Sequence, residues 1–396
     1  MTVVHPIPAA WITTGGTGAQ NYDEFADETE ITRIIEAQPG SALAIEMPHY
    51  APASLGKTFA EALPDAVARL EGAKRDGLYR PEHDVVVLYR ITRGESVSYG
   101  LWCMVDTDQI STSADEPGIV LRNEDVFPEK VRERVALAEA LGHLLSPVLL
   151  LQTGRGDELH NALAKACAEA GAPDATDLDA AGGTHQIWVK KDAPELIELA
   201  GGGELVVADG NHRSLAAQTG GLPRFLAVVT TPASVEIKPY NRLVRGITPE
   251  LPWAAEGAHV RVYTREGGER TITLPRDPAL GFVDNLDHAL VERELLGRAL
   301  GLEPGDKRIT YVGGDYPESW LRREVDEGRA DLAILIDPVT VPDFIEVNLA
   351  RQKMPRKSTW FTPKARAGLV VAESVAEIEE SQAGWHRPDP PSGTSP

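Results

Sequence analysis

Cysteine is almost absent from this sequence of 396 residues, which contains only Cys103 and Cys167. Two cysteines cannot build the disulfide framework of a small secreted protein, and no Cys-x-x-Cys pair or Cys/His cluster has the spacing of a zinc site. The sequence therefore predicts a cytoplasmic protein without structural zinc.

Long apolar segments are missing as well. The longest ones, Pro147–Leu151 and Leu332–Ile336, are far shorter than the roughly 20 residues of a membrane-spanning helix. The residues that follow Met1 show no basic region with an apolar stretch behind it, which is the pattern of an export signal. We therefore expect no association with a membrane.

Positive charge is in deficit, because 39 Lys and Arg residues face 60 Asp and Glu residues, giving a formal net charge of −21. A surface of this sign repels the phosphate backbone of nucleic acids, so we expect no nucleic-acid partner. A small phosphorylated ligand stays compatible with the composition, because two or three local cations are enough to hold it.

The composition that remains is that of a globular protein, with 42% hydrophobic and 25% charged residues. Strands, polar turns and helices alternate along the chain, which predicts a mixed α/β (α+β) fold. We expect residues 1–245 to form a catalytic region with an N-terminal extension. Residues 246–380 would form a C-terminal α/β domain that contributes a basic loop, and residues 381–396 a disordered tail.

Hydrophobic periodicity places the individual elements. The expected helices are Glu30–Ala37, Leu63–Asp76, Glu129–Leu145, Glu158–Ala170, Ser214–Thr219, Asp284–Ala299, Pro317–Glu327 and Val341–Ala350. The expected strands are Asp84–Arg90, Val97–Asp106, Pro147–Leu151, Gln186–Val189, Glu204–Ala208, Arg224–Thr230, His259–Thr264, Arg308–Gly313 and Asp331–Ile336.

The strongest local motif follows the strand that ends at Ala208, where the sequence reads Asp-Gly-Asn-His-Arg over residues 209–213. A glycine turn between a strand and a helix leaves backbone N–H groups and the positive end of the helix facing one point, which suits an anion. His212 and Arg213 add donors for phosphoryl oxygens, and Asp209 suits a magnesium ion or a hydroxyl. A capped surface turn is the alternative.

A second motif precedes the long predicted helix, where Arg122, Asn123 and Glu124 are adjacent. A carboxylate oriented by such neighbours is suited to accept the proton of a hydroxyl nucleophile. A solvated acidic loop is the alternative interpretation.

Basic and aromatic residues are concentrated near the end of the chain, in the segment from Met354 to Lys364. Lys238–Arg242 is a smaller cluster of the same kind. In an acidic chain such a segment is a candidate to face a ligand, although it could equally be a basic loop docked on an acidic surface. The Gly56-Lys57-Thr58 triplet lacks the earlier glycine and the strand of a nucleotide-binding phosphate loop.

Together these motifs resemble the free-serine kinase (SerK-like) family, which has a ParB/sulfiredoxin-type fold, and in particular its longer bacterial branch, long catalogued as a domain of unknown function. The 209–213 turn is similar to the Asp-Gly-His-His-Arg phosphate motif of that fold, and residues 354–364 match the pattern Met-Pro-x-Lys-Ser-Thr-x-Phe-x-Pro-Lys. Tyr22-Asp23, Asn123-Glu124 and Pro239–Arg242 occur in the expected order. Asn21 replaces a proline of the pattern, and asparagine replaces histidine at positions 123 and 211.

The resemblance implies a kinase with a ParB/sulfiredoxin-like catalytic core that uses ATP or ADP with Mg²⁺ to phosphorylate the hydroxyl of free L-serine. It implies that Glu124 is the general base and that Asp209 positions the nucleophile or holds magnesium. The implied phosphate ligands are Gly210, Asn211, His212, Arg213 and Lys357. The implied substrate contacts are Tyr22, Asp23, Arg122, Asn123, Tyr240, Arg242, Ser358 and Thr359, with Arg122 or Arg242 for the substrate carboxylate.

Two alternatives remain open at the level of the sequence. The first is a nucleotide-binding or nucleotide-hydrolysing regulatory switch, since related ParB-type folds act in this way. The second is a kinase for another hydroxylated metabolite, because the asparagine substitutions alter the family pattern. Neither the phosphoryl donor nor the oligomeric state follows from the sequence.

Overall fold

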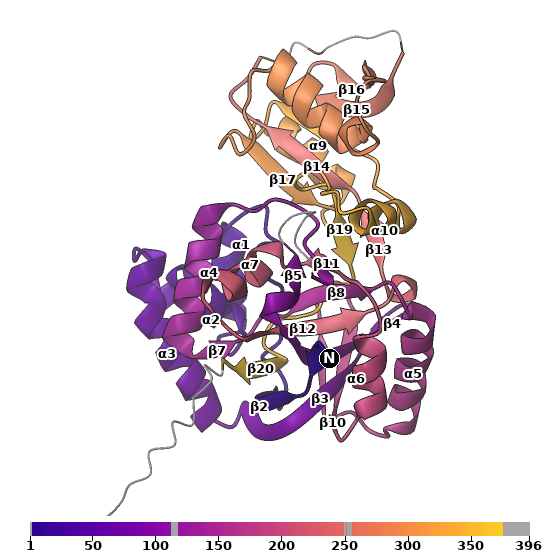
Figure 1. The fold of residues 1–396 in the computed structure, drawn as a ribbon. Helices are drawn as coiled ribbons and strands as arrows, with labels where there is room; N and C mark the ends of the chain where they lie inside the picture. The colour runs from indigo at the N-terminus through magenta and orange to yellow at the C-terminus, as the bar shows by residue number, and fades with distance from the viewer. Residues whose placement is uncertain (1, 112–117, 249–250, 252–255, 375–396) are drawn as a thin grey trace, which may run out of the picture.

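The computed structural model describes residues 2–111, 118–248, 251 and 256–374, and the predicted tail at 381–396 lies outside them. Within these residues the chain forms a thirteen-stranded mixed sheet, a five-stranded sheet and a two-stranded ribbon. Helices pack around both larger sheets (Figure 1). This architecture confirms the mixed α/β class.

The large sheet has the strand order β5-β6-β11-β8-β12-β4-β3-β2-β20-β7, with β1, β9 and β10 attached beside this path. Its strands are β1 Val4–His5, β2 Ile7–Thr13, β3 Tyr79–Arg93, β4 Ser96–Asp106, β5 Ile110–Ser111, β6 Val120–Leu121, β7 His143–Leu144, β8 Val148–Gln152, β9 Ala175–Leu178, β10 Thr184–Lys191, β11 Leu205–Asp209, β12 Arg224–Thr230 and β20 Val370–Glu373. The helices beside it are α1 Thr29–Ala37, α2 Leu43–Glu46, α3 Phe59–Arg75, α4 Pro128–Leu141, α5 Gly156–Glu169, α6 Pro194–Ala200 and α7 Asn211–Thr219.

The smaller sheet has the order β16-β15-β18-β14-β17. Its strands are β14 Tyr240–Val244, β15 Ala258–Thr264, β16 Gly268–Leu274, β17 Ile309–Gly313 and β18 Leu332–Leu335. Apart from short 3-10 helical turns, the remaining elements are α8 Asp287–Leu290, the π-helical segment Val291–Ala299 that continues it, α9 Glu318–Asp326, α10 Val341–Leu349, and the ribbon of β13 Glu236–Lys238 and β19 Trp360–Thr362.

Buried strands at the centre of the large sheet hold the residues that lead into the candidate site. All five residues of β8 are buried, as are the first four of β11 and six of the seven in β12. Continuous apolar runs of this kind are typical of strands covered on both faces. One face packs against Leu159 and Leu163 of α5, and Cys103 is buried in the same cluster.

The two larger sheets exchange chain segments on either side of the predicted boundary at residue 245. β14 lies before this residue but pairs with β17 and β18 in the smaller sheet, whereas β20 returns to pair with β2 in the larger one. The β13–β19 ribbon lies between the two sheets (Figure 1). Residues 354–364 therefore lie between the two larger sheets. The division of the chain into folding domains stays a prediction.

Several helix boundaries differ from the sequence prediction, and a glycine explains two of them. The helix expected to reach Leu145 ends at Leu141, because Gly142 adopts a left-handed conformation with φ 62° and the next two residues pair with β20. The helix expected from Ser214 begins at Asn211, directly after Gly210, whose φ is 97°. A Cβ at position 210 would lie 3.2 Å from the Val148 Cα, a tight contact that adds to the preference for glycine at this turn.

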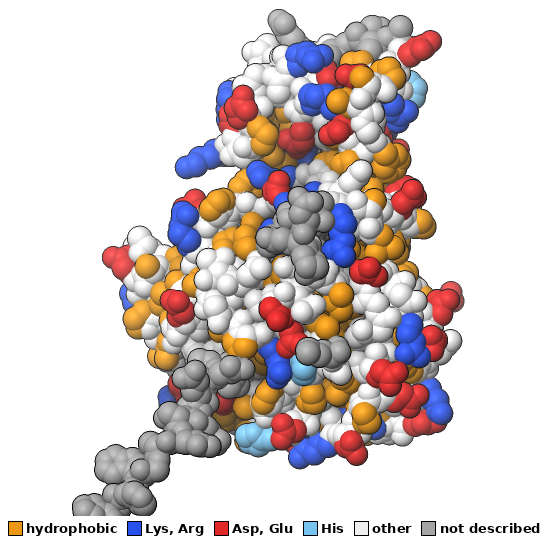
Figure 2. All heavy atoms as spheres, viewed as in Figure 1, with side chains coloured by type: hydrophobic (Ala, Val, Ile, Leu, Met, Phe, Trp, Pro, Cys, Tyr) orange, Lys and Arg blue, Asp and Glu red, His pale blue; other side chains and the backbone are white. Residues whose placement is uncertain are grey.

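Acidic and basic side chains are interspersed on the face of the molecule drawn in Figure 2. Among the residues that the structure describes, no helix combines the length and apolar character needed to cross a bilayer.

Candidate functional site

A small polar cavity lies where the large sheet meets the 354–364 segment. Its volume is about 30 Å³, and it is lined by Asp23, Glu124, Ala208, Asp209, Gly210, Asn211, His212, Tyr240, Lys357, Thr359, Trp360 and Lys364. The three motifs singled out in the sequence thus meet at one point, together with Asp23 from the N-terminal extension. Positions 23 and 364 come together although 341 residues separate them, which only the tertiary fold arranges.

The N-terminus of α7 opens toward this cavity. Gly210 caps the helix, its carbonyl accepts from the Ser214 N–H at 2.9 Å, and Gly210, Asn211 and His212 line the cavity. Backbone N–H groups in the first helical turn have no intrahelical acceptor, and the helix dipole adds positive potential there. The arrangement is suited to bind an anion such as a phosphoryl group.

Asp209 is enclosed by cations. Its Oδ1 accepts from Lys364 Nζ at 2.5 Å, and its Oδ2 accepts from Arg213 Nη2 at 2.6 Å and from Asn21 Nδ2 at 3.3 Å. Burial opposes the charge on Lys364, but the carboxylates of Asp209, Glu24 and Asp23 together outweigh it and raise the pKa of the lysine. Both carboxylate oxygens are thus occupied by the protein's own positive groups.

This geometry does not fit the predicted role of Asp209 as a magnesium ligand. A metal would have to displace Lys364 or Arg213 from a buried ion pair. Within the described part of the chain, no group of three or more His, Cys, Asp or Glu side chains is arranged to hold a metal ion. We therefore derive no catalytic step through magnesium.

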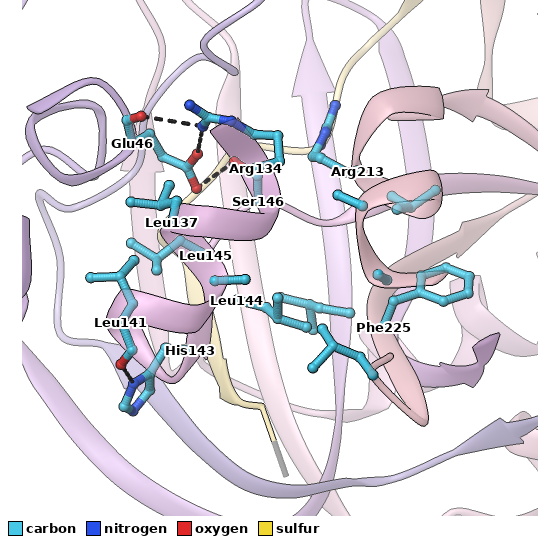
Figure 3. Close-up of a pocket in the computed structure, with 16 residues that line it drawn as sticks. Glu46, Arg134, Leu137, Leu141, His143, Leu144, Leu145, Ser146, Arg213 and Phe225 are labelled. Atoms are coloured by element: carbon cyan, nitrogen blue, oxygen red, sulfur yellow. Dashed lines mark hydrogen bonds and ion pairs between the residues drawn. The ribbon is translucent and has the colours of Figure 1, made fainter. Parts of the chain in front are cut away.

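Arg213 is directed away from the cavity rather than into it. Its Nη1 donates to the Pro147 carbonyl and its Nη2 to Asp209. The side chain lines a second cavity of about 50 Å³ between α4, α7 and β12, with the Arg134–Glu46 ion pair at the same end (Figure 3). We therefore reassign the Arg213 side chain from binding phosphate to holding Asp209.

Glu124 is buried against the basic segment, with 8% of its surface exposed. Its Oε2 accepts the backbone N–H of Lys357 at 2.8 Å. Burial raises the pKa of Glu124, while the charge and the N–H group of Lys357 lower it. A carboxylate with a raised pKa is a stronger proton acceptor than an exposed one, as general-base catalysis requires.

Asp23 presents a second carboxylate to the cavity. Its Oδ1 is buried and has no hydrogen-bond partner within the described residues. Burial favours the protonated form, but the positive charges of Arg213, Lys364 and Lys357 outweigh it and lower the pKa. Asp23 is therefore ionised at neutral pH, and its unpartnered oxygen is available to a ligand that donates hydrogen bonds.

His212 is electrically neutral in this environment. Burial and the nearby Lys357 lower its pKa to about 3. Its Nε2 lies 3.2 Å from the backbone N of Phe127 and accepts the hydrogen bond, so the proton of the neutral ring resides on Nδ1. The ring therefore offers one N–H donor but no positive charge, and its role as a phosphate ligand stays a prediction.

The side chain of Arg242 is not placed to bind the carboxylate of a substrate. The sequence had indicated Arg122 or Arg242 for that role. The Arg242 side chain has no exposed surface. It donates to Glu292 at 2.9 Å and to the backbone carbonyls of Tyr240, Asn241, Arg356 and Lys357. This side chain fastens the basic segment to β14, so we reassign it to positioning.

The other predicted contacts are distributed around the cavity. Tyr240 and Thr359 line it, while Ser358 has no exposed surface and its Oγ has no partner among the described residues. Lys357 is held near Glu124 and Tyr240, which raise its pKa despite the opposing effect of burial. Tyr22 lies under the guanidinium of Arg134 at 4.0 Å, and Arg122 interacts electrostatically with Asp125 outside the cavity lining.

Sequence reasoning missed three charged residues of this site. Lys364 belongs to the recognised basic segment, but its pairing with Asp209 was not foreseen. Glu24 and Lys130 also act electrostatically on the cavity residues. Glu24 follows directly after Tyr22-Asp23, and Lys130 lies in the first turn of α4, shortly after Glu124. Their closeness in sequence to these motifs is the one feature from which they could have been recognised.

Glu24 predicts a measurable pH dependence of stability. Its carboxyl accepts from the Asn21 N–H at 3.0 Å, and burial raises its pKa from 4.5 to about 7. Because the raised pKa favours the protonated form in the folded state, its stabilising effect is complete below pH 4.5 and is lost as pH rises through 7. The change in pKa corresponds to about 3 kcal/mol of unfolding free energy.

We expect Glu24→Gln to remain as stable as the wild type at pH 4.5 and to become more stable above pH 7 by up to that amount. Urea unfolding of both proteins between pH 4.5 and 8 measures the difference. Parallel profiles for the two proteins would show that Glu24 titrates normally.

Comparison with known proteins adds a family and distant structural likenesses. Residues 17–273 match the family model described as "Protein of unknown function (DUF1015)". No curated protein matches the chain. A structure described as "Free serine kinase in complex with AMP" has 12% identity and a TM-score of 0.39, covering 68% of this chain and 92% of that one. "SbnI with C-terminal truncation from Staphylococcus aureus" has 12% identity and a TM-score of 0.41, covering 70% and 90%.

Proposed function

Since this chain belongs to the DUF1015 family, whose description assigns no reaction, we propose a function from the site itself. The proposed activity is the transfer of a terminal phosphoryl group from ATP or ADP to the hydroxyl of free L-serine or a close analogue. The observation that carries it is the meeting of a helix N-terminus, the partly buried lysines Lys357 and Lys364 and the buried carboxylate of Glu124 around one cavity. The motif resemblance described above supplies the choice of L-serine.

In the proposed reaction, the phosphoryl group lies against the backbone N–H groups at the start of α7. The Nδ1–H of His212 and the ammonium group of Lys357 meet its oxygens, which carry the charge that develops during transfer. The start of α7, including His212, is already fixed by the fold, whereas Lys357 lies on the 354–364 segment and meets the phosphoryl group once this segment has adjusted to the substrates.

Glu124 accepts the proton of the substrate hydroxyl in this mechanism. A bond then forms between the hydroxyl oxygen and the terminal phosphorus, and the bond from that phosphorus to the bridging oxygen breaks. The electron pair of the broken bond leaves with ADP, or with AMP when ADP is the donor. The products are O-phosphoserine and the shortened nucleotide, and the proton resides on Glu124 until it is released.

The substrates require the cavity walls to move apart. A volume of about 30 Å³ accommodates a water molecule or two, whereas small-molecule sites usually enclose roughly 300 to 1,000 Å³. The lining comes from the end of β11, the start of α7, the 354–364 segment, Tyr240 of the smaller sheet, and the loop residues Asp23 and Glu124. Binding is therefore expected to displace this segment from α7.

Phosphorus NMR of the purified protein with magnesium, L-serine and either ATP or ADP tests the proposal. We expect a phosphomonoester resonance that matches O-phosphoserine in at least one of the two samples, which also identifies the donor. Nucleotide hydrolysis without this resonance would contradict the serine-kinase assignment and favour another acceptor or a nucleotide switch. No turnover with either nucleotide would contradict the assignment to an enzyme.

A further inference from the structure

Asn123 and Asn211 contact each other directly. The Nδ2 of Asn211 donates to the Oδ1 of Asn123 at 2.6 Å, and the backbone N–H of Asn123 donates to the Oδ1 of Asn211 at 3.3 Å. Only 1% and 6% of the two residues is exposed. The side-chain amide of Asn211 is thus paired at both its donor and its acceptor end.

The same asparagine also reaches the basic segment. The Asn123 carbonyl accepts from the Met354 N–H at 2.6 Å, and its Nδ2 donates to Thr359 Oγ1 at 3.5 Å. Asn123 is followed by Glu124, whose carboxylate accepts from the Lys357 N–H. Asn123 therefore connects the loop before α4 and the N-terminus of α7 with two positions, 354 and 359, of the 354–364 segment.

We propose that Asn123 and Asn211 form an amide clasp that fixes the position of Glu124 relative to the N-terminus of α7. This inference rests on the proposed function, and it changes the roles expected from the sequence: both residues are positioning residues, and neither side chain binds substrate or phosphate. The backbone N–H of Asn211 stays available to the phosphoryl group at the helix end.

The physical basis is the cost of leaving one amide unpaired. Replacing either asparagine by alanine leaves a buried polar partner without its hydrogen bonds, and the two walls can then shift. A displacement of about 1 Å between a base and a reacting group is enough to reduce turnover by about 10²-fold. Removing the second asparagine afterwards has little further effect, because the clasp is already open.

A double-mutant cycle tests the clasp through kcat and KM. We expect Asn123→Ala and Asn211→Ala each to reduce kcat by about 10- to 100-fold with little change in KM for the amino acid. The double variant should lie within about threefold of the worse single variant. A kcat of the double variant that is reduced by the product of the two single reductions would refute the clasp, because independent contacts with the substrate would give that result.

Two isosteric variants sharpen the test, since both add one negative charge at nearly the same place. Asn123→Asp keeps an acceptor for the side-chain amide of Asn211 and therefore retains the clasp. Asn211→Asp loses the Nδ2 donor and places a carboxylate oxygen against the side-chain Oδ1 of Asn123. We expect Asn123→Asp to keep most of kcat. The acid limb of its pH–rate profile should move to higher pH, because the negative charge of the new aspartate raises the pKa of Glu124. Equal losses of kcat in the two variants would refute the clasp.

Failure of the proposed function and failure of the clasp give different results. If the wild-type protein transfers phosphate to no acceptor, the proposed function fails. The double-mutant cycle can then still be carried out with the midpoint of thermal unfolding as the measured quantity. Coupling between the two alanine substitutions in the midpoint of unfolding would then uphold the contact, and additive effects would refute it.

Discussion

Glu124→Gln is expected to lower kcat by roughly 10²-fold or more while the protein stays folded. The amide oxygen of glutamine can still accept the Lys357 N–H that now binds Glu124 at 2.8 Å, so the local structure is retained. What is lost is the capacity to accept the proton of the substrate hydroxyl. Initial rates from the phosphorus NMR assay, together with the midpoint of thermal unfolding, measure both quantities.

The pH–rate profile provides a second readout of Glu124. The base must be ionised to act, so kcat/KM should rise with pH through the pKa of Glu124, which burial raises above its ordinary value. In Glu124→Gln this acid limb should disappear along with most of the activity. If the residual activity kept the same limb, a group other than Glu124 would be the base.

Asp125→Asn is the matched control for this substitution. Asp125 is the next residue in the same loop, but it is exposed and pairs with Lys353 at 2.5 Å on the surface. We expect it to retain near wild-type kcat. A loss as large as that in Glu124→Gln would indicate that charge in the loop, rather than proton transfer, determines the rate.

Asp209→Asn is expected to destabilise the protein by about 3 to 5 kcal/mol, the usual effect of removing one partner of a buried ion pair. The carboxylate now balances Lys364 and Arg213, whose side chains are about nine-tenths buried. Asparagine fills the same space but removes the carboxylate that forms an ion pair with both of these cations. Urea unfolding at pH 7 measures the difference in free energy.

Two further variants establish the cause. Asp306→Asn removes one partner of the exposed Asp306–Arg308 pair and should leave the unfolding midpoint almost unchanged. Adding Lys364→Met to Asp209→Asn removes one of the unbalanced charges and should recover part of the stability. If Asp209→Asn were as stable as Asp306→Asn, the buried network would not be a source of stability.

The motifs of the site could be predicted from the sequence because each of them is local. A strand that runs into Asp209-Gly210 and then into a helix already implies a tight turn with exposed N–H groups, and the structure places this turn in the cavity. Glu124 was recognised from its neighbours in the chain. The mixed α/β class followed in the same way, from the alternation of apolar strands and helical periodicity.

The roles of individual side chains could not be predicted, because they depend on contacts across long sequence separations. The guanidinium group of Arg242 is of a kind that often binds anions, yet Glu292 and four backbone carbonyls accept hydrogen bonds from all of its N–H groups. Arg213 belongs to the phosphate motif, but its side chain turns back to Asp209 and Pro147. A guanidinium group satisfies whichever acceptors the fold brings near, and the sequence does not state which these are.

The sequence by itself determined which residue types are gathered into which motifs, and hence an anion-binding turn and a candidate base. Tertiary structure alone decided that Asn123 meets Asn211, that Lys364 neutralises Asp209 and that Asp23 faces the same cavity. The physical reason is that hydrogen bonds and ion pairs act over a few ångströms of space. The chain returns to the large sheet as β20 after contributing all five strands of the smaller sheet, and this path brings residues 354–364 within that distance.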